Sequence, residues 1–125
     1  MTKLMHLALL LIVLSGCSKG DQAGPSGPAA QGKELAESKA CVSCHPMNGD
    51  AGVAPTWKGL YLSKVELSTG ETVIADEEYL RRSMLEPSSQ TVKGFQEGLM
   101  ETVIKPHSLT DAEVKALIAY IRSLK

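Results

Sequence analysis

The sequence predicts a mostly α-helical domain with long loops and one short β-hairpin. Three observations predict this fold class. The C-terminal segment carries a helix start signal followed by an apolar stripe, residues 76–85 place apolar side chains at helical spacing, and Thr69-Gly70 forms a turn signal. Aromatic residues make up only 4% of the chain. A small domain with few aromatic side chains often adds a cofactor, a metal or disulfides to its core.

The last helix is the most clearly defined element. Thr110 and Glu113 form a capping box, in which each side chain satisfies a backbone N–H group at the start of the helix. An apolar stripe at helical period then follows, made of Val114, Leu117, Ile118, Ile121 and Leu124. The pattern predicts that this helix packs one face into the core.

Two further helices and the hairpin come earlier in the chain. Residues 65–80 predict a hairpin around Thr69-Gly70 and then a helix that starts near Asp76. A first helix is expected over residues 32–45, with Leu35 and Ala36 facing inward. Long loops on their own argue poorly for a compact fold, unless a cofactor supplies the apolar core that they cover.

The N-terminal region predicts export. Lys3 precedes an apolar run from Leu7 to Leu14, which is too short to span a bilayer but suits a secretory signal. Residues 14–17, LSGC, resemble the lipobox of bacterial lipoproteins, in which the cysteine is acylated after cleavage. A plain signal peptide with an incidental Cys17 is the alternative. We therefore expect a signal peptide over residues 1–16, and a protein that is lipid-anchored to a bacterial membrane and faces the periplasm or the cell exterior.

A linker should separate the anchor from the folded domain. Residues 17–30 are expected to comprise the acylated Cys17 and a segment rich in Gly, Pro, Ser and Ala, which cannot bury enough apolar surface to fold. The folded domain is expected over residues 31–125. The charge balance, with 13 basic and 14 acidic residues, gives no basic cluster that would neutralise phosphates. A nucleic-acid partner is therefore not expected.

The segment Cys41-Val42-Ser43-Cys44-His45 places two thiols and an imidazole close together. Such residues serve disulfides, zinc sites, dithiol switches and haem attachment. A structural zinc site needs four ligands and the chain has no second Cys-x-x-Cys pair, while a thioredoxin-like switch is typical of an α/β sheet that is not predicted here. Cys-x-x-Cys-His is the signature of c-type haem attachment, in which both thiols bond to the haem vinyl groups and the imidazole binds iron. The sequence therefore predicts one covalent haem c.

The residue opposite His45 on the iron decides the chemistry. A strong sixth ligand gives electron transfer, whereas an empty position gives gas binding or peroxide chemistry. Met47 is too near His45 in sequence to cross to the opposite haem face, and Met84 lies on a helical stripe where a methionine more often fills the core. Met100 lies in a loop with two glycines and a proline, which can fold over a haem. His107 could do the same, or could be a solvated residue before the last helix.

Several motifs in order resemble class I cytochrome c, closest to the cytochrome c domain fused to subunit II of some bacterial haem–copper oxidases. They cover most of residues 31–125: CVSCH at 41–45, APTWKGLY at 54–61, ADEEYLRRSMLEP at 75–87, KGFQEGLM at 93–100 and LTDAEVKALIAYIRSL at 109–124. The hairpin before the middle helix is also similar. The resemblance implies the class I cytochrome c fold, in which helices and loops surround one covalent haem.

The resemblance also implies roles for single residues. Cys41 and Cys44 would carry the thioethers and His45 would be the proximal ligand. The Pro55 carbonyl would accept a hydrogen bond from the imidazole and so orient it. Trp57 would pack near a haem propionate, although a core aromatic is the alternative, and Met100 would be the distal ligand. The family usually has proline after this methionine, whereas Met100 is followed by Glu101.

Together these features predict a membrane-anchored electron carrier and not an enzyme. Its partners would be redox proteins of the respiratory chain, with a terminal oxidase implied by the resemblance, and no small-molecule substrate is expected. One alternative is a haem sensor or peroxidase-like enzyme with a labile sixth ligand. Another is a subunit that works only within a larger oxidase or dehydrogenase complex.

Overall fold

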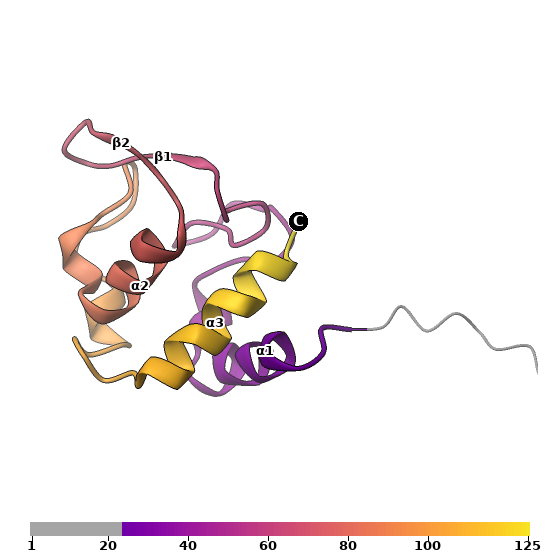
Figure 1. Cartoon of the computed structure of the whole chain (residues 1–125). Helices are drawn as coiled ribbons and strands as arrows, with labels where there is room; N and C mark the ends of the chain where they lie inside the picture. Colours follow the sequence, from indigo (N-terminus) through magenta and orange to yellow (C-terminus); the bar gives the residue numbers. More distant parts are fainter. Residues whose placement is uncertain (1–23) are drawn as a thin grey trace, which may run out of the picture.

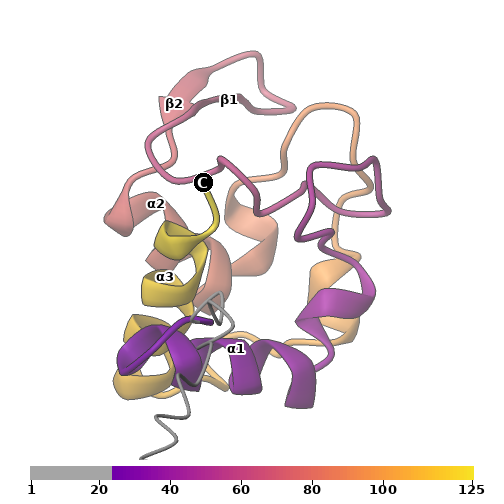
Figure 2. The ribbon, with the colours of Figure 1, turned by 90° about the vertical axis from the view of Figure 1, so that its right-hand side faces the viewer.

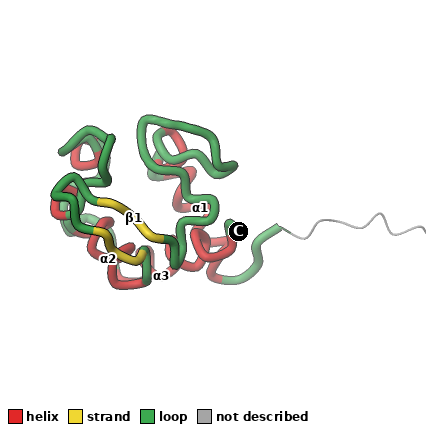
Figure 3. The backbone as a smooth tube through the Cα atoms, turned by 90° about the horizontal axis from the view of Figure 1, so that it is seen from above, coloured by secondary structure: helices red, strands yellow, loops and turns green. Residues whose placement is uncertain are grey.

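The computed structural model describes residues 24–125. The predicted signal peptide, Cys17 and residues 18–23 of the predicted linker lie outside the described residues. The mostly helical architecture with a short hairpin is confirmed, and loops make up much of the chain (Figures 1 and 3). In chain order the elements are α1 (Pro28–Ser38), η1 (Cys41–Ser43), β1 (Lys64–Glu66), β2 (Thr72–Ile74), α2 (Glu77–Leu85), η2 (Pro87–Ser89), η3 (Met100–Thr102) and α3 (Asp111–Ser123), where η marks a 3-10 turn.

Helix α3 begins as the sequence predicts. The Thr110 hydroxyl accepts from the Glu113 backbone N–H at 3.3 Å, and the Glu113 carboxylate accepts from the Thr110 N–H at 2.8 Å. The predicted stripe faces the core, with Val114, Leu117, Ile118 and Ile121 buried and Leu124 partly buried at the end of the helix. The capping box satisfies two backbone N–H groups at the start of α3, and the buried apolar face packs the helix into the core.

Helix α1 differs from the expected helix at both ends. It starts at Pro28, so residues 28–30 of the predicted linker are helical, and it ends at Ser38 instead of continuing to His45. Proline suits the first turn of a helix, because its missing N–H would have no partner there. Ala40 then adopts a left-handed conformation with φ 59°, which stops the helix before the cysteines. The inward placement of Leu35 and Ala36 is confirmed, since Ala36 is fully buried and Leu35 packs against the core.

Helices α1 and α3 cross in close contact (Figures 1 and 2). The contact depends on Gly32, where a Cβ atom would lie 2.0 Å from the Ala116 carbonyl oxygen and 2.7 Å from the Tyr120 Cβ. Only glycine lets the two backbones approach this closely. The pair forms one side of the molecule, and the hairpin lies at the opposite end (Figure 1).

The hairpin and α2 also follow the predicted order. Strands β1 and β2 are antiparallel, with Lys64 opposite Ile74 and Glu66 opposite Thr72. Gly70 adopts φ 89° in the connecting turn, a conformation that glycine reaches without strain. Asp76 caps α2 by accepting from the Tyr79 N–H at 2.9 Å, which confirms the predicted helix start. None of the helices in residues 24–125 is long and apolar enough to cross a membrane.

Candidate functional site

One cavity lies between the elements, with a volume of about 410 Å³. Its lining is mostly apolar and draws on segments from Ala40 to Ile121, including η1, β1, α2, η3 and α3. Cavities of roughly 300–1,000 Å³ hold cofactor-sized ligands in proteins. The five residues Cys41, Cys44, His45, Pro55 and Trp57 all line it, as does Met100. The fold therefore brings these six candidate residues to one space, although they span 60 positions of the chain.

Cys41, Cys44 and His45 are presented by one tight turn. The Cys44 and His45 N–H groups both donate to the Cys41 carbonyl, at 3.2 and 2.9 Å. Both cysteines are free thiols and partly buried. Burial raises the pKa of the Cys41 thiol, so this thiol is protonated at neutral pH. The turn thus offers two free thiols and one imidazole on a short, hydrogen-bonded piece of backbone.

The imidazole of His45 is fixed by Pro55. Its Nδ1 lies 2.7 Å from the Pro55 carbonyl oxygen, which can only accept, so Nδ1 carries the proton and donates it. Nε2 is then the unprotonated nitrogen, the form that binds a metal. Burial lowers the pKa of His45 and the Pro55 hydrogen bond opposes this only in part, so the ring stays neutral. This is the contact expected from the sequence.

The loop that carries Pro55 is tied back to the same turn. Ala54 N–H donates to the Cys44 carbonyl at 3.1 Å, and Trp57 N–H donates to the Pro46 carbonyl at 2.8 Å. The Thr56 hydroxyl also donates to the Pro46 carbonyl, at 2.8 Å. These bonds hold the Pro55 carbonyl in place, because the backbone on both sides of it is anchored.

Trp57 is part of the core and part of the cavity wall. It is only 4% exposed, its ring centroid lies 5.1 Å from that of His45, and it packs edge-on against Tyr120 at 6.3 Å. The indole therefore supports the imidazole from one side. This position is compatible with both predictions for Trp57, a core aromatic residue and a residue beside the cofactor.

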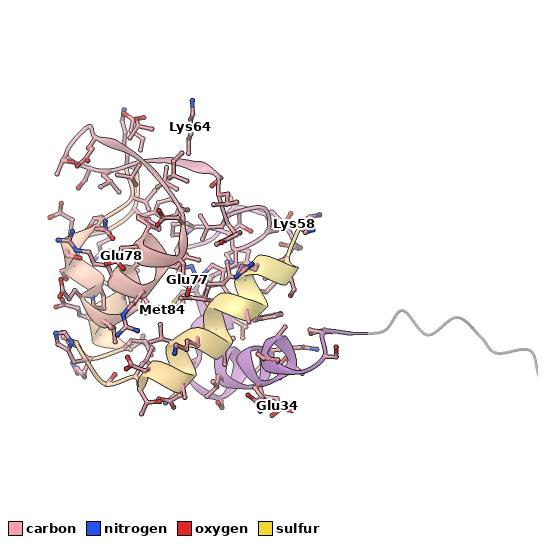
Figure 4. All side chains as sticks on the ribbon, in the orientation of Figure 1. Glu34, Lys58, Lys64, Glu77, Glu78 and Met84 are labelled. Carbon is pink, nitrogen blue, oxygen red and sulfur yellow. The ribbon has the colours of Figure 1, made fainter. Side chains whose placement is uncertain are left out.

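The four candidates for the sixth ligand separate in the structure. Met100 opens η3, is partly buried and lines the cavity. Met84 lines it too, but is 5% exposed and belongs to the core on α2 (Figure 4). Met47 packs against the core away from the cavity lining, and His107 is exposed and donates its backbone N–H to the Leu85 carbonyl. Geometry thus leaves Met100 and Met84.

Sequence reasoning did not assign the hairpin to the site. Val65 and Glu66 of β1 line the cavity, as do Val92 and Lys93 from the segment after α2. Strand β1 has only three residues, so its alternation of apolar and polar side chains is too short to show which face of the strand is covered.

The donor set fits a haem. Two thiols and an unprotonated imidazole nitrogen lie on one turn, a thioether reaches the same cavity from a distant segment, and apolar side chains make up most of the wall. Thioether bonds to Cys41 and Cys44 with His45 on the iron use each of these groups. The charged residues of the lining are Lys64, Glu66 and Lys93, and the rest of the wall suits a large apolar ring.

Comparison with known proteins gives the family. The family model for cytochrome c matches residues 29–125, which is most of the chain and nearly all that the structure describes. A search of curated proteins finds no match. The match confirms the class I cytochrome c fold and implies covalently bound haem c and electron transfer, since members of this family are generally electron carriers. With its attachment turn, its oriented histidine and its matched domain, this chain belongs to the cytochrome c family.

Proposed function

We propose that this protein is a membrane-anchored cytochrome with one haem, which passes single electrons between respiratory redox partners. One observation carries the proposal: a single apolar cavity contains one Cys-x-x-Cys-His turn, whose imidazole is oriented by the Pro55 carbonyl at 2.7 Å. Bound there, haem supplies a one-electron Fe(III)/Fe(II) couple.

The chain's own residues set the conditions for that couple. Cys41 and Cys44 would hold the porphyrin edge, and His45 would bind iron through Nε2. The Pro55 carbonyl and the Trp57 indole keep the imidazole in one orientation, so the ligand does not have to reorganise when the charge on iron changes. We place Trp57 beside a haem propionate. The apolar wall excludes water and so favours the less charged Fe(II) state.

Met100 is the sixth ligand in this proposal. Met84 sits on the buried stripe of α2, where its side chain fills the core together with Tyr79 and Leu80. Met100 is only partly buried and lies on a turn between loops, so its thioether can move toward iron without opening the core. A thioether opposite histidine raises the reduction potential, as an electron carrier requires.

Spectroscopy of the haem-loaded protein tests this assignment. Met100→Ala should convert the low-spin oxidised spectrum to high-spin in absorption and paramagnetic resonance, and should allow carbon monoxide to bind the reduced protein. Met84→Leu is the matched control, because it keeps the volume of a buried side chain and should leave the spectrum low-spin. A wild-type protein that is high-spin and binds carbon monoxide readily would contradict the carrier function. A Met100→Ala variant that stays low-spin would exclude Met100 as ligand.

A haem sensor or peroxidase-like enzyme is the second candidate function. One observation favours it: Glu101 follows Met100, so no proline stiffens the turn that presents the thioether. A labile Met100 would open the iron to a small molecule. Peroxide turnover by the wild-type protein at a rate similar to that of Met100→Ala would support this candidate over the carrier.

The partner is proposed from the resemblance to oxidase-fused domains. We propose a terminal oxidase as electron acceptor, with the domain acting either as a mobile carrier or as a subunit of a larger oxidase or dehydrogenase complex. Purification from membranes in mild detergent separates these two cases. Recovery as a single chain that reduces an oxidase on mixing supports the carrier, whereas stoichiometric recovery with other subunits supports the complex.

We propose that Cys17 carries the lipid anchor and that residues 1–16 are removed as a signal peptide on export. The sequence LSGC at residues 14–17 supports this proposal. The same lipid would anchor the domain on the outer side of a bacterial membrane, and more than one acyl chain gives stable attachment. Cys17→Ser should move the protein from the membrane to the soluble fraction. Continued membrane retention of Cys17→Ser would count against acylation.

A further inference from the structure

The segment after α2 pairs with the free edge of the hairpin. Leu67 and Val92 form an antiparallel bridge, in which the Ser68 N–H donates to the Thr91 carbonyl at 2.8 Å and the Lys93 N–H donates to the Glu66 carbonyl at 2.9 Å. Residues 91–93 therefore lie along β1 on the side opposite β2. Figures 1 and 2 show the orange segment rising beside the hairpin.

Side chains reinforce this pairing. The Lys93 Nζ lies 2.6 Å from Glu66 Oε1, with the two side chains 64% and 49% exposed. The Ser68 hydroxyl donates to Glu97 Oε1 at 3.3 Å. Beneath them Leu67 is buried in the core and Val92 packs against it. Lys64, the lysine of the hairpin itself, extends away from the molecule (Figure 4), and Lys93 from the segment after α2 is the cation that Glu66 contacts.

Met100 follows this bridge by eight residues. The intervening chain contains Gly94 and Gly98, both with positive φ and with no atom within 4 Å of where a Cβ would be. These residues give the chain little stiffness of their own. On the other side, the Val103 and Ile104 N–H groups donate to the Met100 carbonyl, and Ile104 is buried. The turn that presents Met100 is thus held at Ile104 on one side and at the hairpin on the other.

We propose that the β1–β2 hairpin is a positioning element for the sixth ligand, with Glu66 and Lys93 as its positioning residues. The pairing of Glu66 and Leu67 with residues 92 and 93 fixes where the Met100 segment starts, and so takes the place of the stiffness that a proline after Met100 would give. This inference rests on the proposed role of Met100 as ligand.

A charge-reversal cycle in the haem-loaded full-length protein tests the proposal. Glu66→Lys and Lys93→Glu each place like charges together, and the double variant Glu66→Lys/Lys93→Glu restores an ion pair. Imidazole binding to the oxidised protein is the measurement, since imidazole competes with the sixth ligand. Removing an exposed ion pair changes a binding or folding equilibrium by about 1.4-fold to fivefold. Replacing the attraction by a repulsion between like charges makes the change larger.

We expect each single variant to bind imidazole about three- to tenfold more tightly than wild type, with a weaker thioether-to-iron charge-transfer band. The double variant should return close to wild-type affinity. Lys33→Glu is the matched control, because it makes the same change in the exposed Lys33–Glu37 pair of α1 and should not alter imidazole affinity. Wild-type affinity in both single variants, or no recovery in the double variant, would overturn the proposal.

The same cycle in Met100→Ala separates this inference from the assignment of the ligand. With the thioether gone, Lys93→Glu should no longer change imidazole affinity. If Met100→Ala itself leaves the low-spin spectrum intact, the assignment of Met100 fails. If Met100→Ala abolishes that spectrum while the charge reversals have no effect in the Met100 protein, only the hairpin inference fails.

Hydrogen exchange gives a readout that does not depend on added ligand. In Lys93→Glu the amides of Val103 and Ile104, which donate to the Met100 carbonyl, should exchange about three- to tenfold faster than in wild type. The amide of Val114 in α3 should be unchanged, because it donates to the Thr110 carbonyl in the first turn of α3 and not to the Met100 carbonyl. Equal acceleration at all three amides would indicate general destabilisation and would contradict a positioning role.

Discussion

Gly32→Ala should destabilise the protein, although alanine is the better helix former. The new Cβ would lie 2.0 Å from the Ala116 carbonyl oxygen and 2.6 Å from its carbonyl carbon. Reaching even 3.0 Å requires a shift of about 1 Å, and the obstacle is helix backbone that cannot rotate away. Overpacking against a rigid backbone costs about 3 kcal/mol, whereas the better helix propensity of alanine contributes about 1 kcal/mol in the opposite direction. The expected net loss is therefore about 2 kcal/mol.

Urea unfolding of the haem-loaded protein measures this loss. With an m value of about 2 kcal/mol/M, a loss of 2 kcal/mol lowers the midpoint by about 1 M. Gln31→Ala is the matched control, since Gln31 is an exposed neighbour on α1 and its change should stay within about 0.5 kcal/mol. A Gly32→Ala variant as stable as wild type would mean that α1 and α3 do not cross at this contact, and the packing argument would be wrong.

Two further predictions concern the wall of the site and the pH dependence of stability. Trp57→Ala should lower the free energy of unfolding by about 3–5 kcal/mol, because a buried indole that contacts His45 and Tyr120 is lost. Urea unfolding measures this loss. A loss below about 1 kcal/mol would contradict the packing role of Trp57. The pKa of Glu113 falls from 4.5 to about 2, mainly because its carboxylate accepts from the Thr110 N–H. The charged form is thus favoured in the folded state, so its contribution is complete above pH 4.5 and is lost as the pH falls toward about 2. Glu113→Gln should flatten the stability profile in that window relative to wild type, and an unchanged slope in urea unfolding across it would refute the assignment.

Local signals in the sequence determined the helices that have strong caps. Thr110 and Glu113 mark the start of α3, and Asp76 marks the start of α2, because a capping side chain bonds to backbone within three residues of itself. The attachment turn is equally local, since Cys41, Cys44 and His45 are close in the chain. The end of α1 was not predictable in this way, because Ala40 carries no signal for the left-handed conformation that it adopts.

The sequence by itself determined the class of site: it showed which residues can bond to haem, and that a loop containing Met100 can bring a thioether to it. The resemblance implied the contact between His45 and Pro55, but only the tertiary structure showed this contact and the others that complete the site. The bond from His45 to the Pro55 carbonyl joins positions ten residues apart, and the pairing of Glu66 with Lys93 joins positions 27 apart. Contacts at such separations depend on how the whole chain packs around the cavity, because no local pattern records which backbone groups meet. For that reason His107 could be set apart from Met100 only by the cavity that the folded chain encloses, whereas the closeness of Met47 to His45 in the sequence already argued against Met47.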